Sequence, residues 1–162
     1  MTSPTRLGIP RVQVVEYWLP LLVWLLCIHL FSTDAFSSSE SSKIIVPILK
    51  FFFPEMTPER IDFWHTVVRK AAHVAEYFVT GILAYRVFHY GDASMVRAKI
   101  VTILFVLVAA MSDETHQLMT ASRTGSLFDV GFDMSGAVIA TWFLASMKKR
   151  AVIDRAYSRG GL

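Results

Sequence analysis

Long apolar runs alternate along the chain with short polar segments, in a pattern typical of membrane helices. The first run, residues 17–31, reaches about 20 residues with its flanks, enough for a helix that crosses a bilayer. Three further runs, at residues 77–88, 100–112 and 134–147, hold only about 12 to 14 apolar residues each. At 1.5 Å per residue they fall roughly 10 Å short of a hydrocarbon core about 30 Å thick. We therefore expect polar residues to complete three of the helices.

These runs predict an all-α membrane protein, a bundle of about four transmembrane helices with an interfacial segment between the first and second. The predicted parts are a cytoplasmic N-terminal tail (1–11), a first transmembrane helix (12–31), an external loop with an amphipathic segment (32–68), a three-helix core (69–147) and a basic cytoplasmic tail (148–162).

Two alternatives accompany this division of the chain. A basic start and the motif TDA at residues 33–35 also suit a cleaved signal peptide, although the long aromatic-rich run favours a retained anchor. In the external loop, Phe51, Phe52 and Phe53 are expected to dip into the outer interface. A loop packed on the bundle is the competing interpretation.

Basic residues set the expected orientation. Four spans place the N-terminus, the 89–99 loop and the C-terminus on one side, together with ten Lys and Arg residues: Arg6, Arg11, Arg86, Arg97, Lys99, Lys148, Lys149, Arg150, Arg155 and Arg159. The other side has six, which are Lys43, Lys50, Arg60, Arg69, Lys70 and Arg123. This excess predicts that both termini lie in the cytoplasm.

Composition agrees with a membrane location and excludes several other classes. Hydrophobic residues make up 54% of the 162 residues, mean hydropathy is +0.47, and charged residues are 18% against about 25% in soluble domains. The single cysteine, Cys27, excludes an intramolecular disulfide and a cysteine-built zinc site. A net charge of only +3, dispersed along the chain, argues against a nucleic-acid partner.

Polar residues collect at the predicted outer end of each short helix. Helical spacing gives each helix one polar stripe, with Lys70, His73 and Tyr77 on the first, Asp113 and Gln117 on the second, and Asp129 and Asp133 on the third. Small residues continue two of the stripes inward and suit close helix packing: Gly81, Ala84, Gly136 and Ala140. Because a charge facing lipid is unfavourable, we expect the stripes to face one another around a polar pocket.

The polar residues, in their order and spacing, resemble the VanZ-like family of bacterial membrane proteins. Its pattern is a basic residue and His before Glu-Tyr, then Asp-Glu-x-x-Gln, an Arg in a short loop, and an Asp followed four residues later by Asn or Asp and then Gly. The matching residues are Lys70, His73, Glu76, Tyr77, Asp113, Glu114, Gln117, Arg123, Asp129, Asp133 and Gly136. One departure is Asp133, where Asn is often found. The resemblance implies a role in cell-envelope physiology or in tolerance of teicoplanin-type glycopeptides.

Three roles for this constellation remain open. It could be a structural network of ion pairs and hydrogen bonds between helix ends. It could bind an amphipathic envelope molecule such as a lipid-linked wall precursor, with Lys70 and Arg123 on its phosphate or carboxylate. It could also catalyse acid–base chemistry on a lipid headgroup through His73, Asp113 or Asp129. The predicted ligand residues are Lys70, His73, Glu76, Tyr77, Asp113, Glu114, Gln117, Arg123, Asp129 and Asp133.

No cofactor and no metal site are predicted. HVAE (73–76) and DETH (113–116) offer ligand atoms, but without the closed spacing of a metal motif. The sequence identifies neither the ligand nor the oligomeric state.

Overall fold

The structure, a computed structural model, describes residues 11–90, 94–119 and 126–159, with side chains from Val15 to Met147 within these ranges. Every regular element in the described ranges is helical. The elements are α1 (Arg11–Phe31), the short 3-10 helix η1 (Asp34–Phe36), α2 (Ser38–Phe52), α3 (Pro58–Phe88), α4 (Met95–Leu118) and α5 (Leu127–Arg159). The predicted all-α fold class is confirmed.

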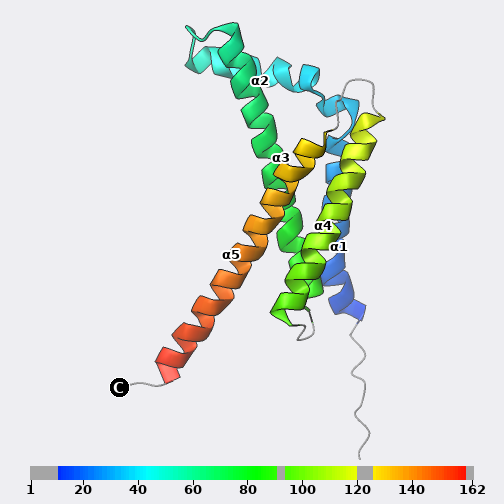
Figure 1. Cartoon of the computed structure of the whole chain (residues 1–162), viewed down its shortest axis with the longest axis vertical. Coiled ribbons are helices and arrows are strands. Elements are labelled where there is room, and N and C mark those ends of the chain that lie inside the picture. Colours follow the sequence, from blue (N-terminus) through cyan, green and yellow to red (C-terminus); the bar gives the residue numbers. More distant parts are fainter. Residues whose placement is uncertain (1–10, 91–93, 120–125, 160–162) are drawn as a thin grey trace, which may run out of the picture.

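Helices α1, α3, α4 and α5 form an elongated bundle, and α2 lies across its upper end in Figure 1. The start of α1 and the end of α5 lie at the lower end, whereas α4 ends and α5 begins near the upper end. Helix α3 packs most extensively against α5 and also contacts α4 and α1. We call the end where α4 stops and α5 starts the polar end of the bundle, and the opposite end the apolar end.

The short apolar runs are parts of longer helices, as predicted. The run at residues 100–112 lies within α4, which continues to Leu118 through Asp113 and Glu114. Likewise α3 begins at Pro58, and α5 begins at Leu127 before Asp129 and Asp133. The added helical turns carry the polar residues, so each helix reaches a length that its apolar run alone does not have.

Two or three of the helices are long and apolar enough to cross a membrane. Met95–Leu118 and Leu127–Met147 each qualify alone, and Val15–Phe31 qualifies when joined to Asp34–Phe52, from which it is bent by 75°. Helix α3 is absent from this set because Arg69, Lys70, Glu76 and Arg86 interrupt its apolar sequence. The predicted count of four spans is thus not reached on length and composition.

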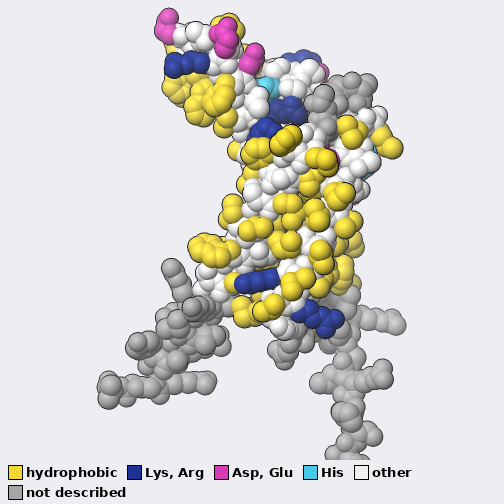
Figure 2. Space-filling view, viewed as in Figure 1, with side chains coloured by type: hydrophobic (Ala, Val, Ile, Leu, Met, Phe, Trp, Pro, Cys, Tyr) yellow, Lys and Arg dark blue, Asp and Glu magenta, His cyan; other side chains and the backbone are white. Residues whose placement is uncertain are grey.

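The surface of the bundle nevertheless suits lipid. Exposed apolar side chains recur every four residues along α4, at Val96, Ile100, Leu104 and Val108. Hydrophobic side chains cover the middle of the face shown in Figure 2, with Lys and Arg above and below them. A band of this kind is what a bilayer requires of a protein surface.

Two small residues bring α3 and α5 into close contact. A Cβ atom added at Gly136 would overlap the carbonyl oxygen of Val74 and lie 2.8 Å from the backbone nitrogen of Phe78. One added at Gly81 would lie 2.9 Å from the Cβ of Ala140. The close packing expected from the small-residue stripes is therefore present, and it fixes how the two helices face each other.

Helix α2 lies in the segment expected at the membrane interface. The hydroxyl of Ser37 accepts a hydrogen bond from the backbone N–H of Glu40 and caps its start. Ser41 Oγ lies 3.0 Å from His65 Nε2 and joins α2 to α3. Ile44, Ile48, Phe51 and Phe52 are exposed. That this apolar face rests in the interface remains a prediction.

Candidate functional site

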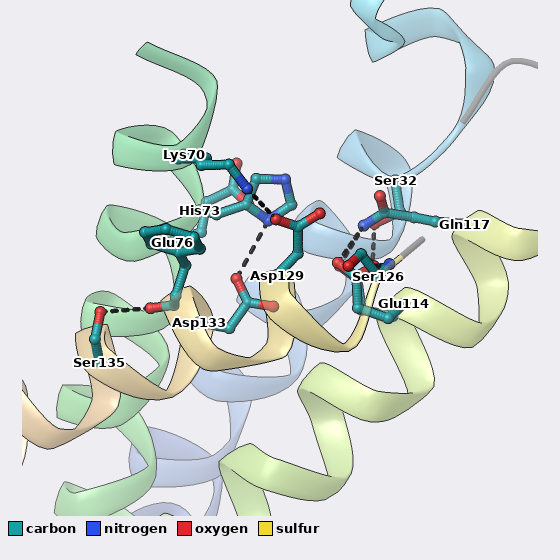
Figure 3. A network of polar contacts seen from close by, with 12 residues as sticks. Ser32, Lys70, His73, Glu76, Glu114, Gln117, Ser126, Asp129, Asp133 and Ser135 are labelled. Carbon is teal, nitrogen blue, oxygen red and sulfur yellow. Dashed lines mark hydrogen bonds and ion pairs between the residues drawn. The ribbon is translucent and has the colours of Figure 1, made fainter. Parts of the chain in front are cut away.

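The polar end gathers the predicted stripes of α3, α4 and α5 at one level of the bundle (Figure 3). Asp113, Glu114, Gln117 and Asp133 are buried there, in a region where a helix bundle would ordinarily bury apolar side chains. Arg123 lies outside the described residues. Contacts among the predicted ligand residues form two groups. One group contains Lys70, His73, Asp129 and Asp133, and the other contains Asp113, Glu114 and Gln117.

The first group joins α3 to α5. Lys70 Nζ forms an ion pair with Asp129 Oδ1 and also lies 4.4 Å from the centre of the Phe132 ring. One helical turn further along, His73 Nδ1 lies 3.3 Å from Oδ1 of Asp133. Lys70 was expected to bind a ligand. Any such ligand would have to compete with Asp129, which already contacts the ammonium group of Lys70.

The second group surrounds the end of α4. Asp113 accepts hydrogen bonds from the hydroxyl of Ser32 and, at 3.0 Å, from the side-chain amide of Gln117. Glu114 accepts from the backbone N–H of Ser126 at 2.8 Å and from the same amide at 3.4 Å. Neutral donors thus bond both buried carboxylates, and α1 and the start of α5 are tied to α4 through them.

Some buried polar atoms make no hydrogen bond within the described part of the chain. They include His73 Nδ1, the hydroxyl of Tyr77 and both carboxylate oxygens of Asp133. Asp133 has an exposed fraction of 0%, so bulk water does not reach it. A buried carboxylate without hydrogen bonds is unusual, because desolvation makes such a group unfavourable unless it is paired or bound to a metal.

Two of the cavities at the polar end share Arg69 and His73. The first, of about 270 Å³, lies between the end of α1, η1, α2 and α3 and is lined by Phe31, Ser32, Phe36, Ser41, Ile45, Val68, Arg69, Ala72, His73 and Glu76. We call it the amphipathic cavity, because apolar and ionisable side chains line it together. The second, of about 190 Å³, is the polar cavity; its lining is Thr66, Arg69, Lys70, His73, Gln117 and Asp129.

The three candidate acid–base residues do not share one cavity. His73 and Asp129 both line the polar cavity. Asp113 instead lines a separate cavity of about 320 Å³ beside Tyr77 and His29. A mechanism that uses Asp113 and His73 on the same reacting group is therefore not supported by this geometry.

Arg69 lies at the site although it is not among the predicted ligand residues. It lines both cavities and forms no ion pair in the described residues. Its spacing held a signal, because residues 69, 73 and 76 follow steps of four and three along one helical face. Ser32 stands beside the end of α1, and Ser126 stands beside the start of α5, where its hydroxyl accepts from the backbone N–H of Phe128. Only the folded bundle brings these two residues to Asp113 and Glu114.

The model of the VanZ/LLP1 family matches residues 17–148, which is most of the chain and includes every residue that lines the two cavities. No curated protein and no solved structure matches the chain.

Proposed function

Because the chain belongs to the VanZ/LLP1 family, as its motifs predicted, we propose that it binds an amphipathic molecule of the bacterial cell envelope at its polar end. Through this binding it contributes to envelope physiology or to tolerance of teicoplanin-type glycopeptides. The observation that supports the proposal is the amphipathic cavity. Phe31, Phe36 and Val68 offer it apolar surface, and Arg69 offers a cation at the same opening.

The chemistry of this cavity suits one end of a larger ligand. A volume of about 270 Å³ lies just below the range of about 300 to 1,000 Å³ for ligand pockets, so the cavity would accept a headgroup and the first part of a chain. The guanidinium of Arg69 can donate two parallel hydrogen bonds to a phosphate or carboxylate. A lipid-linked wall precursor carries both a diphosphate and a hydrocarbon chain, and it is the ligand class that we propose.

The topology that goes with this role has four spans in the cytoplasmic membrane and both termini in the cytoplasm. The distribution of basic residues supports it, as does the position of the start of α1 and the end of α5 at the same end of the bundle. With Cys27 replaced by serine, a cysteine at Ser39 should react with an impermeant reagent in intact cells. A cysteine at Ser94 should react only after permeabilisation, and the reverse pattern would overturn this topology.

Binding is tested by comparing two arginines of α3. Wild-type protein in lipid nanodiscs should bind a fluorescent polyprenyl-diphosphate wall precursor. Arg69→Gln should weaken this at least tenfold, or about 1.4 kcal/mol, because a charge-assisted contact is lost. Arg60→Gln, at an exposed position that lines neither cavity, serves as the matched control. Equal affinities of the wild type and Arg69→Gln would reject the proposal, as would equal teicoplanin tolerance of cells that express them.

A second candidate function is acid–base catalysis on the headgroup of the same ligand class. It is supported by His73 and Asp129, which share the polar cavity with the cations Arg69 and Lys70. Incubation of the wild-type protein with labelled precursor separates the two functions. A chemically altered product that is absent with His73→Gln supports catalysis, and binding without any product supports recognition alone.

A further inference from the structure

Three helices each contribute one metal-ligating side chain to a single point of the polar end. They are His73 of α3, Glu114 of α4 and Asp133 of α5, and one ligand atom of each lies within 4.8 Å of the others. We propose that these three side chains bind a divalent transition-metal ion of the Zn²⁺ or Mn²⁺ type. This revises the expectation, drawn from the sequence, that the chain has no metal site.

The spacing of the three side chains fits such an ion. Two ligand atoms bound at about 2.1 Å in tetrahedral geometry lie about 3.4 Å apart. His73 Nδ1 and Asp133 Oδ1 are 3.3 Å apart, which is this separation. A carboxylate oxygen of Glu114 lies within 4.8 Å of the ligand atoms of the other two residues, so Glu114 is the ligand that must move toward the ion. The two closest ligands therefore need almost no adjustment.

The state of Asp133 provides an independent argument for a cation. Its carboxylate has no exposed surface, and neither oxygen makes a hydrogen bond in the described part of the chain. Protonated His73 could pair with Oδ1, but that pairing leaves Oδ2 without a partner. A buried carboxylate that neutral donors do not satisfy is stabilised by pairing or by metal coordination.

The charges near the cluster also favour a dication. Of the two cations of α3 that line the polar cavity with His73, Asp129 holds Lys70 in an ion pair, and Arg69 forms no ion pair with Glu114 or Asp133 in the described residues. Asp113 and Glu114 are bonded by neutral groups, which leave their negative charge in place. A dication among Glu114, Asp133 and neutral His73 would balance the two carboxylates without requiring a proton on the imidazole.

The ligand set selects the class of metal. One imidazole nitrogen and two carboxylates suit Zn²⁺ or Mn²⁺ and do not suit metals that prefer thiolate ligands. Gln117 bonds both Asp113 and Glu114, and so orients the carboxylate of Glu114 as partners around a metal site commonly do. Three protein ligands leave a coordination position open, and His73 lies on the wall of the polar cavity.

The test is metal binding by the purified full chain in nanodiscs after removal of metals with a chelator. Titration with Zn²⁺ alone and with Mn²⁺ alone should show one ion bound per chain and a higher melting temperature for at least one of the two. Asp133→Asn, Glu114→Gln and His73→Gln should each weaken binding at least tenfold. Asp62→Asn is the control carboxylate, exposed on the same helix as His73, and should bind like the wild type.

The pair His29 and His116, whose rings are 4.4 Å apart, is the alternative metal-binding position to exclude. His29→Gln should leave binding unchanged, and a loss of binding there with full binding in Asp133→Asn would overturn the proposal. If the site variants do not accumulate, measurements on the wild-type protein alone test the proposal. X-ray absorption of the bound ion should show one imidazole among oxygen ligands, whereas several imidazoles, or no bound ion of either metal, would refute the assignment.

Discussion

The two ends of the bundle are held together by different interactions. At the apolar end, Leu21 of α1 packs against Ala84 and Val87 of α3 in a cluster without charged residues. At the polar end, α1 contacts α4 through Ser32 and Asp113, and α3 contacts α5 through Lys70 and Asp129. One end depends on the fit of surfaces, and the other on the placement of donors and acceptors.

The difference shows what a lipid environment leaves available to join helices. Lipid chains are as apolar as leucine, so the apolar end gains little from removing side chains from water and is stabilised by packing. Hydrogen bonds and ion pairs at the polar end are directional and fix the rotation of each helix. Substitutions at the apolar end should thus change stability alone, and those at the polar end should change both stability and the site.

The largest effect is expected at the close contact of α3 with α5, which holds the two helices together between the two ends. Gly136→Leu would place a side chain into the backbone of α3 around Val74, and we expect the protein not to accumulate in membranes. Gly131→Ala is the matched control, because a Cβ there meets nothing within 4 Å and alanine favours a helix by about 1 kcal/mol. Normal accumulation of Gly136→Leu would mean that α3 and α5 do not cross this closely.

Leu21→Ala should have the next largest effect and act through packing only. Leu21 has no exposed surface, and removal of its side chain should lower stability by about 2 kcal/mol, the lower end for a buried leucine. Leu22→Ala, at a neighbouring position that is 55% exposed, should change stability little. Unfolding in mixed micelles measures both, and equal losses would show that burial does not distinguish the two positions.

Ser32→Ala tests the polar end with a smaller change. It removes the hydroxyl that donates to Asp113, a bond to a carboxylate worth about 1.5 kcal/mol. Stability in the same assay should fall by that amount, and the exposed position Ser38 should tolerate alanine without loss. Unchanged stability of Ser32→Ala would show that α1 is not anchored to α4 through this bond.

The smallest effect concerns the junction of α2 and α3 and depends on pH. Burial and the nearby charge of Arg69 lower the pKa of His65, against a weaker opposing effect of Asp62. The folded chain then binds fewer protons here than the unfolded chain. The stabilisation is complete above the unfolded pKa of about 6.5 and is lost as pH falls through the lower folded pKa.

Hydrogen exchange of α2 at pH 7.5 and pH 5 measures this effect when each rate is divided into the intrinsic exchange rate at that pH, and the resulting protection factors should be lower at pH 5. The protection factors of His65→Gln should not depend on pH in this range. Wild-type protection factors that do not change with pH would contradict the interpretation.

Periodicity along the chain was enough to predict much of this architecture. Because side chains at steps of three and four share a helical face, the spacing of Lys70 and His73 is enough to assign them to one stripe. The close approach of α3 and α5 at Gly81 and at Gly136 followed from the small size of these residues. These are properties of a single helix, and a sequence reports such properties directly.

Relations between helices were harder to predict. Neither the contact of His73 with Asp133 nor that of Lys70 with Asp129 could be predicted, because both depend on how α5 is rotated against α3. Ser32 and Asp113 are 81 residues apart in the sequence, so no local pattern could link them. The three proposed metal ligands were not grouped by the sequence for the same reason, since each helix offers only one of them.

The crossing at Gly136 has one more consequence for the neighbouring charges. Asp133 stands one turn before Gly136, and its helix cannot shift toward or away from α3 without breaking a backbone-to-backbone fit. Repulsion among the acids in this part of the protein therefore cannot relax by spreading the helices. The repulsion can then be lowered by uptake of a proton or a cation. The close contact of Gly136 with the backbone of Val74 therefore determines how strongly the acids beside it attract positive charge.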